Sequence, residues 1–496
     1  MKGFREEGRK RGRAHFLIFF SLHHSFIILT GLFLVSIQVP GWAQKQSFVK
    51  SYGGSADETG LLVVPREGDG FFIAAYIESV PGFGAAWMIR TDEFGETLWT
   101  RTIVDSGETV IFRGAVGDGE GGVILAGQKR TGRGDWDMVA VRIDSAGDKV
   151  WQTTSGSSSD DIATNISAVR DGWLMVGNTL QTGGYDVRLV KLDQSGNQVW
   201  SRVIGGSQND LAYGIARTED FGAVIAGTTY PPNSRFSDIL LFKVNYWGEV
   251  VWWRQFGGLF WDEAQAVIQT PDSGFAIAGF SSSYGEDMDG FLLRTDFNGD
   301  TLWLRSYTLP GFQRFYGLVQ TGADGFVLVG EDIQTGEEAN LLLLRTDAVG
   351  QLVWHRCYGG EGYECGRTII QLADGGLVST GRTWTGPVNR FDVYLVRTDS
   401  LGQIGMRTGQ RIGRVGQGIR FFPNPFSNRV RVETGVGPGV ARIFSQNGTV
   451  IRILSSGEPN HQFIWDGCDF NGRQVPPGVY ILSICGQHQV KLVKCD

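Results

Sequence analysis

Acidic side chains recur along the chain at corresponding places, and aromatic side chains stand close to them in the sequence. Carboxylates beside exposed aromatic rings suit sugars, whose hydroxyl groups donate to carboxylates and whose apolar ring faces stack on aromatic rings. Carboxylates could also bind Ca²⁺, a hard cation that takes several oxygen ligands. The recurring acids are Asp57, Glu108, Asp160, Asp161, Asp210, Asp262 and Glu364, and Gln313 stands at the one corresponding place that lacks an acid.

The regularity of these acids favours a structural role over a binding role. Turns obey a repeat, whereas binding sites usually break it, and a carboxylate in such a turn can accept hydrogen bonds from backbone N–H groups. Aromatic side chains that are not repeated are therefore the better candidates. We predict ligand contacts for Trp261, Tyr363 and Trp384, together with the neighbouring acids Asp262 and Glu364.

Groups that could catalyse a reaction are scarce. Beyond residue 43 the histidines are His355, His461 and His488, and the sequence holds no nucleophile elbow, metal-binding histidine pair or phosphate-binding loop. A glycoside hydrolase needs two carboxylates roughly 5 to 9.5 Å apart, and the sequence does not single out a pair. We therefore expect a non-catalytic module that binds carbohydrate or a surface protein, with no metal site and with Ca²⁺ as the one cofactor left open. A polysaccharide-degrading glycoside hydrolase and a purely structural envelope protein are the alternatives.

These residues belong to units of about 51 residues. A motif of the form Asp-x-x-Gly-x-x-x-Trp, with Asn for Asp once, ends at Trp99, Trp151, Trp200, Trp252, Trp303 and Trp354. A seventh acid, Asp399, keeps the period, but Met406 stands in its tryptophan position. Because the tryptophan recurs in unit after unit, we predict that it packs between neighbouring units. The Asp and Gly before it are expected to form a turn, with Asp accepting backbone N–H bonds and Gly supplying a positive φ.

Each unit consists of four short apolar segments separated by turns, as in YGIART, GAVIAGTT, DILLFKV and EVVWWRQF at residues 213–256. Alternating or short continuous apolar runs bounded by Gly, Asp and Asn indicate β-strands rather than helices. The 72 glycines and the low charged fraction of 20% also fit a turn-rich all-β protein. Four strands per unit predict the blades of a β-propeller, and seven units predict a seven-bladed ring at residues 44–400.

The two ends of the repeat predict how the ring closes. The segment FVKSYGG at residues 48–54 matches WHRCYGG at residues 354–360, with Phe48 in the tryptophan position, and the last unit has three good strands before Asp399. We predict that residues 48–52 supply the fourth strand of the blade whose other strands lie in residues 366–399. Such pairing would remove the two exposed edges that an open ring would leave.

The beginning of the chain indicates export. Six Lys or Arg residues in the first 14 positions precede an apolar run from Phe16 to Val39 and a small-residue site at Gly41-Trp42-Ala43. We interpret residues 1–43 as a signal peptide; its length leaves an uncleaved membrane anchor as the alternative. No later segment is long and apolar enough to span a membrane, so the mature chain is expected to have no transmembrane segment. The formal charge is −7 overall and −11 without the leader, which gives no electrostatic reason to bind nucleic acid.

Five cysteines are too few to hold an exported chain of 496 residues together by disulfides. Cys357 and Cys365 flank a turn and could pair, and Cys468, Cys485 and Cys495 could provide one bond near the C-terminus. The pairing cannot be deduced from the spacing, and small buried thiols are the simpler interpretation.

After the repeat, residues 401–420 form a linker rich in Gly and Arg, and residues 421–496 contain strand-like runs that predict a small β-sandwich. The tail holds FPNPF, IFSQNGTVIRIL, WDGCDFNGRQVPPGVYILSI and QVKLVK in this order. This combination resembles the Ig-like C-terminal sorting domain of proteins exported by the bacterial type IX (Por) secretion system. The residues that carry the resemblance are Pro423, Asn424, Pro425, Trp465, Gly478 and Tyr480.

The resemblance implies export across both membranes of a Bacteroidota-like bacterium, with the type IX secretion machinery as the partner of residues 421–496. The protein is then expected to be secreted or held at the outer-membrane cell surface. The chain ends in KCD rather than directly after the basic strand, so the resemblance does not decide between cleavage and anchoring of the tail.

Overall fold

The computed structural model describes residues 47–404, except 55, 67–69, 81–82, 104–108, 286, 323–324, 334–337, 361 and 385–389. In the tail it describes residues 420–422, 429–433, 440–445, 449–455, 462–484 and 488–494. The regular elements in these ranges are all β-strands, so the chain is an all-β protein as the sequence predicts.

Residues 48–398 form seven antiparallel units of four strands, numbered here I to VII, within the described ranges. Neighbouring units I and II are linked by one residue pair, Gly84 with Val110, and units VI and VII by Ala339 with Tyr363. Unit I consists of β2 (Asp57–Arg66), β3 (Gly70–Val80), β4 (Phe83–Thr91) and β5 (Thr97–Ile103), and unit II of β6 (Val110–Gly117), β7 (Val123–Arg130), β8 (Trp136–Ile143) and β9 (Lys149–Ser155). Unit III consists of β10 (Asp161–Val169), β11 (Gly172–Gln181), β12 (Gly184–Asp193) and β13 (Gln198–Ile204), unit IV of β14 (Asp210–Arg217), β15 (Ala223–Thr229), β16 (Asp238–Val244) and β17 (Val250–Phe256), and unit V of β18 (Asp262–Gln269), β19 (Phe275–Ser281), β20 (Asp289–Thr295) and β21 (Thr301–Tyr307). Unit VI consists of β22 (Phe312–Gln320), β23 (Phe326–Ile333), β24 (Ala339–Thr346) and β25 (Leu352–Tyr358), and unit VII of β26 (Tyr363–Gln371), β27 (Leu377–Trp384), β28 (Asp392–Thr398) and β1 (Phe48–Tyr52).

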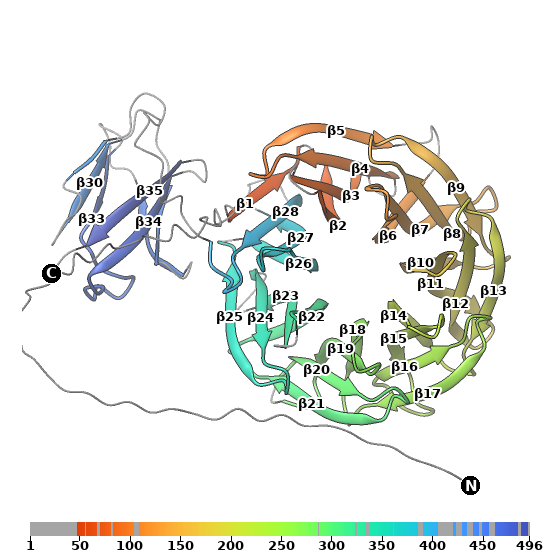
Figure 1. Cartoon of the computed structure of the whole chain (residues 1–496). Helices are drawn as coiled ribbons and strands as arrows, with labels where there is room; N and C mark the ends of the chain where they lie inside the picture. The colour runs from red at the N-terminus through yellow and green to blue at the C-terminus, as the bar shows by residue number, and fades with distance from the viewer. Residues whose placement is uncertain are drawn as a thin grey trace, which may run out of the picture. The chain divides into compact units, whose positions relative to one another are not determined.

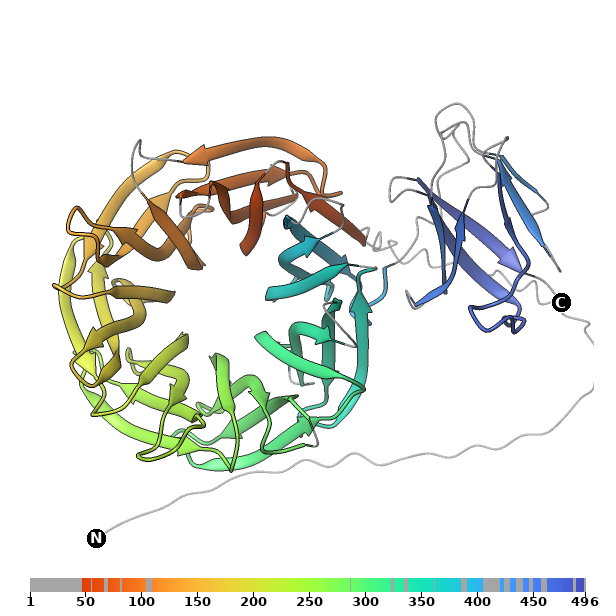
Figure 2. The ribbon, with the colours of Figure 1, turned by 180° about the vertical axis from the view of Figure 1, so that it is seen from behind.

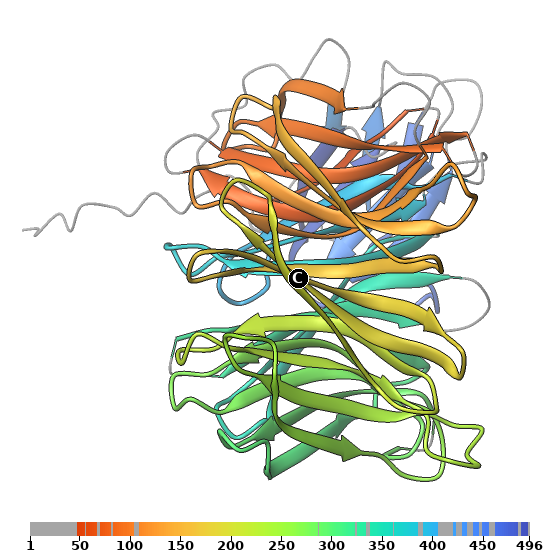
Figure 3. The same cartoon turned by 90° about the vertical axis from the view of Figure 1, so that its right-hand side faces the viewer.

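The seven units follow one another around a ring, as a β-propeller requires (Figures 1 and 2). The first strand of each unit lies at the centre and the fourth strand at the circumference (Figure 1). From the side, the strands of the ring run from one face to the other, so the connecting turns gather on two faces (Figure 3). The turns that lead from one unit to the next lie on the same face as the loops between second and third strands, because the strands within a unit alternate in direction. We call this the loop face.

The hydrophobic core lies between neighbouring units rather than within a single sheet. The second and third strands are apolar on both faces, and all seven residues of β15 are buried, because a further unit packs on each side. One core cluster, for example, joins Leu174 and Leu189 of unit III to Ile225 and Phe242 of unit IV. The residues of a fourth strand such as β17 are partly buried or exposed, as expected for a strand with one face in solvent.

The repeated motif forms the turn between third and fourth strands, as predicted. In unit III, Asp193 Oδ1 accepts hydrogen bonds from the N–H groups of Ser195 and Asn197, and Gly196 adopts φ +84°. The Trp151 ring of unit II lies directly over Gly196, where a Cβ atom would approach it to 2.6 Å. The same contact recurs between Trp99 and Gly147, Trp200 and Gly248, Trp252 and Gly299, Trp303 and Gly350, and Trp354 and Gly402. These tryptophans are partly buried and join each unit to the next one.

The ring is closed by the strand at the chain's beginning. β1 pairs antiparallel with β28, in a register that places Phe48 opposite Arg397 and Tyr52 opposite Val393. The ring of Phe48 lies over Gly95 of unit I, in the place that tryptophan takes elsewhere, and its side chain is 8% exposed. The predicted closure of the last blade by residues 48–52 is therefore confirmed; in the views of the ring, β1 lies beside β28 (Figure 1).

The ring continues beyond the boundary expected at residue 400. The seventh turn is complete, because Gly402 N donates a hydrogen bond to Asp399 O at 3.2 Å. The Trp354 ring lies over Gly402, and Ile404 packs on the core between units VI and VII. Residues 405–419 of the expected linker lie outside the described residues. Cys357 and Cys365 are free thiols rather than a pair, and burial raises the pKa of each to about 12. Cys468 is also free, and Cys485 and Cys495 lie outside the described residues.

The C-terminal part is described by itself as two sheets, β29 (Arg420–Phe422) with β30 (Val430–Glu433) and β33 (Gln462–Trp465), and β32 (Val450–Ser455) with β31 (Val440–Ser445), β34 (Gly478–Ile484) and β35 (His488–Lys494). One apolar cluster contains side chains of both sheets, as in a β-sandwich. Trp465, 1% exposed, lies 5.0 Å from the Tyr480 ring between centroids, and its Nε1 donates to Cys468 O. Gly478 opens β34, whereas Pro423, Asn424 and Pro425 lie outside the described residues.

Within the described residues, no helix is long and apolar enough to cross a membrane. The predicted signal peptide at residues 1–43 lies outside these residues.

Candidate functional site in the central channel

Each first strand of the ring carries a β-bulge at the same place. In β6 the pairing with β7 runs from Phe112 to Gly114 and leaves Arg113 without a partner, and in β26 it runs from Gly366 to Thr368 and leaves Arg367 without one. A bulge inserts an extra residue and re-aims its side chain. The seven residues so inserted are Leu61, Arg113, Thr164, Tyr213, Gln265, Tyr316 and Arg367.

All seven inserted residues line one cavity in the centre of the ring, with a volume of about 770 Å³. We call this cavity the channel. Asp57 at the start of β2, Glu78 near the end of β3, and Arg382 and Phe391 also line it, so the cavity reaches the loop face. Its size falls within the range of small-ligand pockets. The inserted residues differ from unit to unit, whereas the turns and core positions repeat, so the channel is where the ring departs from its own symmetry.

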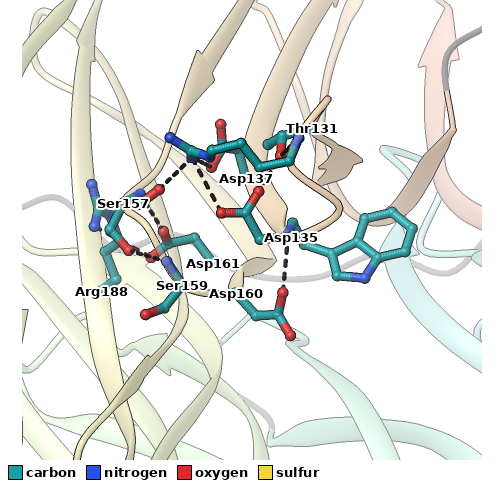
Figure 4. Close-up of polar contacts among 10 residues, drawn as sticks. Thr131, Asp135, Asp137, Ser157, Ser159, Asp160, Asp161 and Arg188 are labelled. Atoms are coloured by element: carbon teal, nitrogen blue, oxygen red, sulfur yellow. Dashed lines mark hydrogen bonds and ion pairs between the residues drawn. The ribbon is translucent and has the colours of Figure 1, made fainter.

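The recurring acids have the structural role that their regularity favours. In unit III, Ser157 N donates to Asp161 Oδ2 at 2.6 Å, and Arg188 Nη1 donates to Asp161 Oδ1 at 3.2 Å (Figure 4). The neighbouring Asp160 accepts a hydrogen bond from Trp136 N at 3.0 Å. Equivalent bonds run from Gly206 N to Asp210, from Gly258 N to Asp262, from Leu309 N to Gln313 and from Gly360 N to Glu364.

Two of the sequence assignments in this set are wrong. The residue of unit I that corresponds to Asp161 is Glu58 rather than Asp57, because it stands three residues before the inserted Leu61 and is 2% exposed. The corresponding residue of unit II is Val110, and Glu108 lies outside the described residues. The side chain of a strand residue changes face with every step, so an error of one residue places Asp57 at the channel instead of in the interface between units.

Asp262 and Glu364 do not face a ligand, contrary to prediction. Asp262 is 0% and Glu364 1% exposed. Asp262 accepts hydrogen bonds from Gly258 N and from the hydroxyls of Ser281 and Ser283. Glu364 accepts them from Gly360 N and the Thr383 hydroxyl. Burial raises the pKa of both carboxyl groups, which costs the folded state at neutral pH and is offset by these donors.

Glu58→Gln is expected to stabilise the ring at pH 8 by about 1 to 3 kcal/mol. Burial, then the charges of Asp392 and Asp57, raise the pKa of Glu58 to about 7. A carboxyl group whose pKa is higher in the folded state stabilises the fold when the pH is below its pKa in the unfolded chain, which is near 4.5. This stabilisation is lost as the pH rises through about 7, the pKa of Glu58 in the folded state. The gain of the variant should therefore shrink toward pH 5. Unit VI already uses an amide here, since Gln313 accepts from Leu309 N and donates to Asp332.

Thermal unfolding followed by circular dichroism at pH 5 to 8 measures this gain. Glu93→Gln, which changes an exposed carboxylate in the turn after β4, is the control and should shift the curve little at any pH. A Glu58→Gln variant that is less stable than the parent at pH 8 would show that the ionised carboxylate is favourable where it stands.

Trp261 lies in an exposed aromatic cluster on the loop face. Its ring is 5.4 Å from that of Phe236 and 6.3 Å from that of Tyr230, and Phe236 also contacts Phe260 at 5.6 Å. Trp261 is 37%, Phe260 50% and Leu259 81% exposed. We call these five residues the Trp261 cluster. They come from the loop after β15 and the turn before β18, and no other unit repeats the set.

The other two predicted aromatic contacts lie together in unit VII. Tyr363 on β26 pairs in register with Trp384 on β27. Tyr363 Oη donates a short hydrogen bond to Glu331 of unit VI, and the Arg382 guanidinium lies 5.2 Å from the centroid of its ring. Tyr363 is therefore part of a polar network beside the channel. Unit VI lies between this pair and unit V, so the structure does not bring Tyr363 and Trp384 into the Trp261 cluster.

The channel wall of units VI and VII holds a buried carboxylate that is fully engaged. Glu331 is 0% exposed; its Oε1 accepts from Tyr316 Oη at 2.7 Å and lies 3.5 Å from Arg314 Nη1, and its Oε2 accepts from Tyr363. The Arg367 guanidinium lies 4.5 Å from the centroid of the Tyr316 ring. Burial raises the pKa of Tyr316 above its ordinary value, so its hydroxyl stays a neutral donor.

Sequence reasoning missed the inserted residues. A bulge breaks the two-residue period by which strand residues are assigned to a face, so periodicity could not place them. A signal was present, however: three positions after the buried acid or its equivalent, the repeat shows Leu, Arg, Thr, Tyr, Gln, Tyr and Arg. A position that varies inside a strict repeat points to a site rather than to packing.

Among the described residues, no group of three or more His, Cys, Asp and Glu side chains is arranged to hold a metal ion.

No known family model and no curated protein match this chain. Among solved structures, it is similar to YCF48 bound to D1 peptide, with 12% identity, 74% of this chain and 97% of that chain covered, and a TM-score of 0.41. It is also similar to BBS1N in complex with ARL6DN, with 11% identity, 73% of this chain and 97% of that chain covered, and a TM-score of 0.40. A third similar structure is a fungal alcohol oxidase of the AA5 family in complex with copper, with 11% identity, 91% of this chain and 99% of that chain covered, and a TM-score of 0.45. Such low identities and TM-scores carry no argument about what this chain binds.

Proposed function

We propose that the protein is a secreted or cell-surface binding module that holds carbohydrate in the channel and on the adjoining loop face, without catalysing a reaction. The observation that carries this proposal is the ring of seven inserted residues, of five types, around a cavity of about 770 Å³. Structural positions of the ring repeat, so the inserted positions, which vary and face inward, are free to serve a ligand. The leader and the tail motifs support export through the type IX machinery, with residues 421–496 as the sorting signal.

The chemistry of the channel suits sugars better than an apolar ligand. Its lining combines tyrosine rings, from Tyr76, Tyr213 and Tyr316, with amide and charged groups that include Asn165 and Gln265. Sugars need apolar faces to stack on and polar groups to pair with their hydroxyls, and both are present here. Burial raises the pKa of Tyr213, so its hydroxyl is a neutral donor at physiological pH.

The Trp261 cluster supports a second contact with the same chain of sugars. A polysaccharide that enters the channel from the loop face would continue across that face, where the cluster offers exposed aromatic surface. Aromatic rings held in place by their neighbours lose little entropy when a sugar ring stacks on them.

A glycan array with the mature chain tests the proposal. Binding should fall at least tenfold for Tyr213→Ala in the channel and by a smaller factor for Trp261→Ala on the loop face, since each removes stacking area. Trp247→Ala is the matched control, because Trp247 is 60% exposed but lies in the turn between β16 and β17 on the other face. Full binding by both variants, or no binding by the parent protein to any glycan, would refute the proposal.

A reducing-end assay on the polysaccharide that the array identifies separates binding from hydrolysis. Asp57 and Glu78 are opposite each other in the register of β2 and β3, and both line the channel. Two carboxylates in such a position are the pair on which a glycoside hydrolase would depend. If the protein releases reducing ends from a bound polysaccharide, and Glu78→Gln abolishes this release, the protein is a glycoside hydrolase rather than a binding module.

A further inference from the structure

Two arginines of the channel form no ion pair within the described residues. Within the described residues, Arg113 has one side-chain hydrogen bond, from Nε to Gln128 Oε1 at 3.3 Å, and no ion pair. Arg367 donates no hydrogen bond within those residues and stacks on the Tyr316 ring. Both are inserted residues, on β6 and β26, and Leu61 of unit I separates them around the ring.

The two guanidinium groups lie close enough to affect each other. Burial lowers the pKa of Arg113, and the charge of Arg367 lowers it further. Like charges in a partly desolvated cavity repel each other, and a buried charge without a partner costs free energy. The fold nevertheless places arginine at two positions where the repeat elsewhere has Leu, Thr, Tyr or Gln.

Asp57 and Glu78 line the channel and Glu331 lies beside it, and none of them forms an ion pair with Arg113 or Arg367 within the described residues. The pKa of Arg367 is raised, against the effect of burial, in part by the charge of Glu331. Both oxygens of Glu331 accept hydrogen bonds, from Tyr316 and Tyr363, and Arg314 lies beside it. Asp57 Oδ1 accepts a hydrogen bond from Phe391 N at 3.0 Å. After burial, the interactions that shift the pKa of Arg113 are those with Tyr76, Arg367 and Tyr213, and both tyrosines are neutral at physiological pH because burial raises their pKa values.

We propose that Arg113 and Arg367 form an anion site, which takes the carboxylate or sulfate of an acidic oligosaccharide in the channel. A planar guanidinium donates two parallel hydrogen bonds to such a group, and an anion between two guanidiniums cancels their repulsion. Tyr76 and Tyr213, which line the same cavity, would contact the sugar that carries the acidic group. This inference rests on the proposed function, since it names the class of carbohydrate.

Isothermal titration calorimetry with the mature chain and three oligosaccharides of equal length tests the inference: one neutral, one of uronic acids and one sulfated. The parent should bind an acidic chain at least tenfold more tightly than the neutral one, with the preference reduced in high salt. The arm that binds more tightly identifies carboxylate or sulfate as the anion. Arg113→Gln and Arg367→Gln should each reduce the preference at least tenfold, because charge-assisted hydrogen bonds are lost.

The variants carry their own control for folding. Arg113→Gln should leave the melting temperature unchanged or raise it, because burial and the charge of Arg367 lower the pKa of Arg113 in the folded state. Weaker binding by this variant can therefore not be ascribed to an unfolded ring. Arg202→Gln changes an exposed arginine on the outer strand β13 and should leave binding unchanged.

The outcomes separate this inference from the function on which it rests. Equal binding of neutral and acidic chains, with the preference unaffected by Arg113→Gln, would overturn the anion site and leave carbohydrate binding intact. If no oligosaccharide binds but free glucuronate or sulfate raises the melting temperature in an Arg113-dependent way, the anion site stands and the carbohydrate function fails. If neither the oligosaccharides nor the free anions bind, both are wrong.

Discussion

A chain that begins at Gly53 instead of Gln44 is expected to lose most of the stability of the ring. Such a chain lacks β1, the fourth strand of unit VII, and with it the buried Phe48 side chain that covers Gly95. Loss of a buried Phe side chain alone costs about 3 to 5 kcal/mol. The five residue pairs between β1 and β28 are lost as well, so the total exceeds this amount.

The deletion also changes how the protein behaves in solution. β28 becomes an exposed edge strand, and exposed edges pair with other chains. We expect a markedly lower melting temperature in calorimetry and aggregation in light scattering. A synthetic peptide of residues 46–54 should restore both properties when added in excess, and Phe48→Trp, which installs the residue used by the other units, should remain folded. A chain from Gly53 that melts like the parent would show that the closure contributes little.

Gly248→Ala is expected to destabilise the ring by about 2 to 4 kcal/mol, the second largest effect of a single change. Gly248 adopts φ +78°, a conformation that costs a residue with a Cβ atom about 1 to 2 kcal/mol. The new Cβ would also lie 2.7 Å from the Trp200 ring, which must move away from its seat between units III and IV. Urea unfolding measures the loss.

Two variants establish the cause. Gly206→Ala introduces a methyl group where nothing lies within 4 Å, and it should change stability by less than about 0.5 kcal/mol. Adding Trp200→Leu to Gly248→Ala should cost less than the sum of the two single changes, because the smaller side chain relieves the clash. Additive costs would mean that backbone conformation alone accounts for the loss.

The architecture could be predicted from the sequence because the repeat shows the same signal many times. The motif that ends at Trp99 and its equivalents set the length of the unit, and the match of Phe48 to Trp354 located the closing strand. Both rest on local turn chemistry and on large aromatic side chains, which act in the same way in every unit. The turn at Asp399 is formed even without its tryptophan, because Gly402 serves Trp354 of the preceding unit.

The site was harder to predict, for reasons that lie in the strands themselves. Asp57 and Glu58 are adjacent in sequence, yet one faces the channel and the other the interface between units, and only the register decides which. Asp262 and Trp261 are adjacent too, and one is buried while the other is exposed. Arg113 and Arg367 appear in the sequence as ordinary strand arginines, since their importance depends on a bulge and on being brought near each other by ring closure.

The bulges have a consequence for how such a protein can change over generations. The first and second strands of a unit pair normally on both sides of each inserted residue. The backbone therefore accommodates the bulge without requiring a particular side chain at that position. A single substitution can therefore alter which ligand the channel binds, while the turns and tryptophans elsewhere continue to stabilise the fold. Seven such positions around one axis would let selection, or an engineer, retune specificity stepwise on an unchanged scaffold.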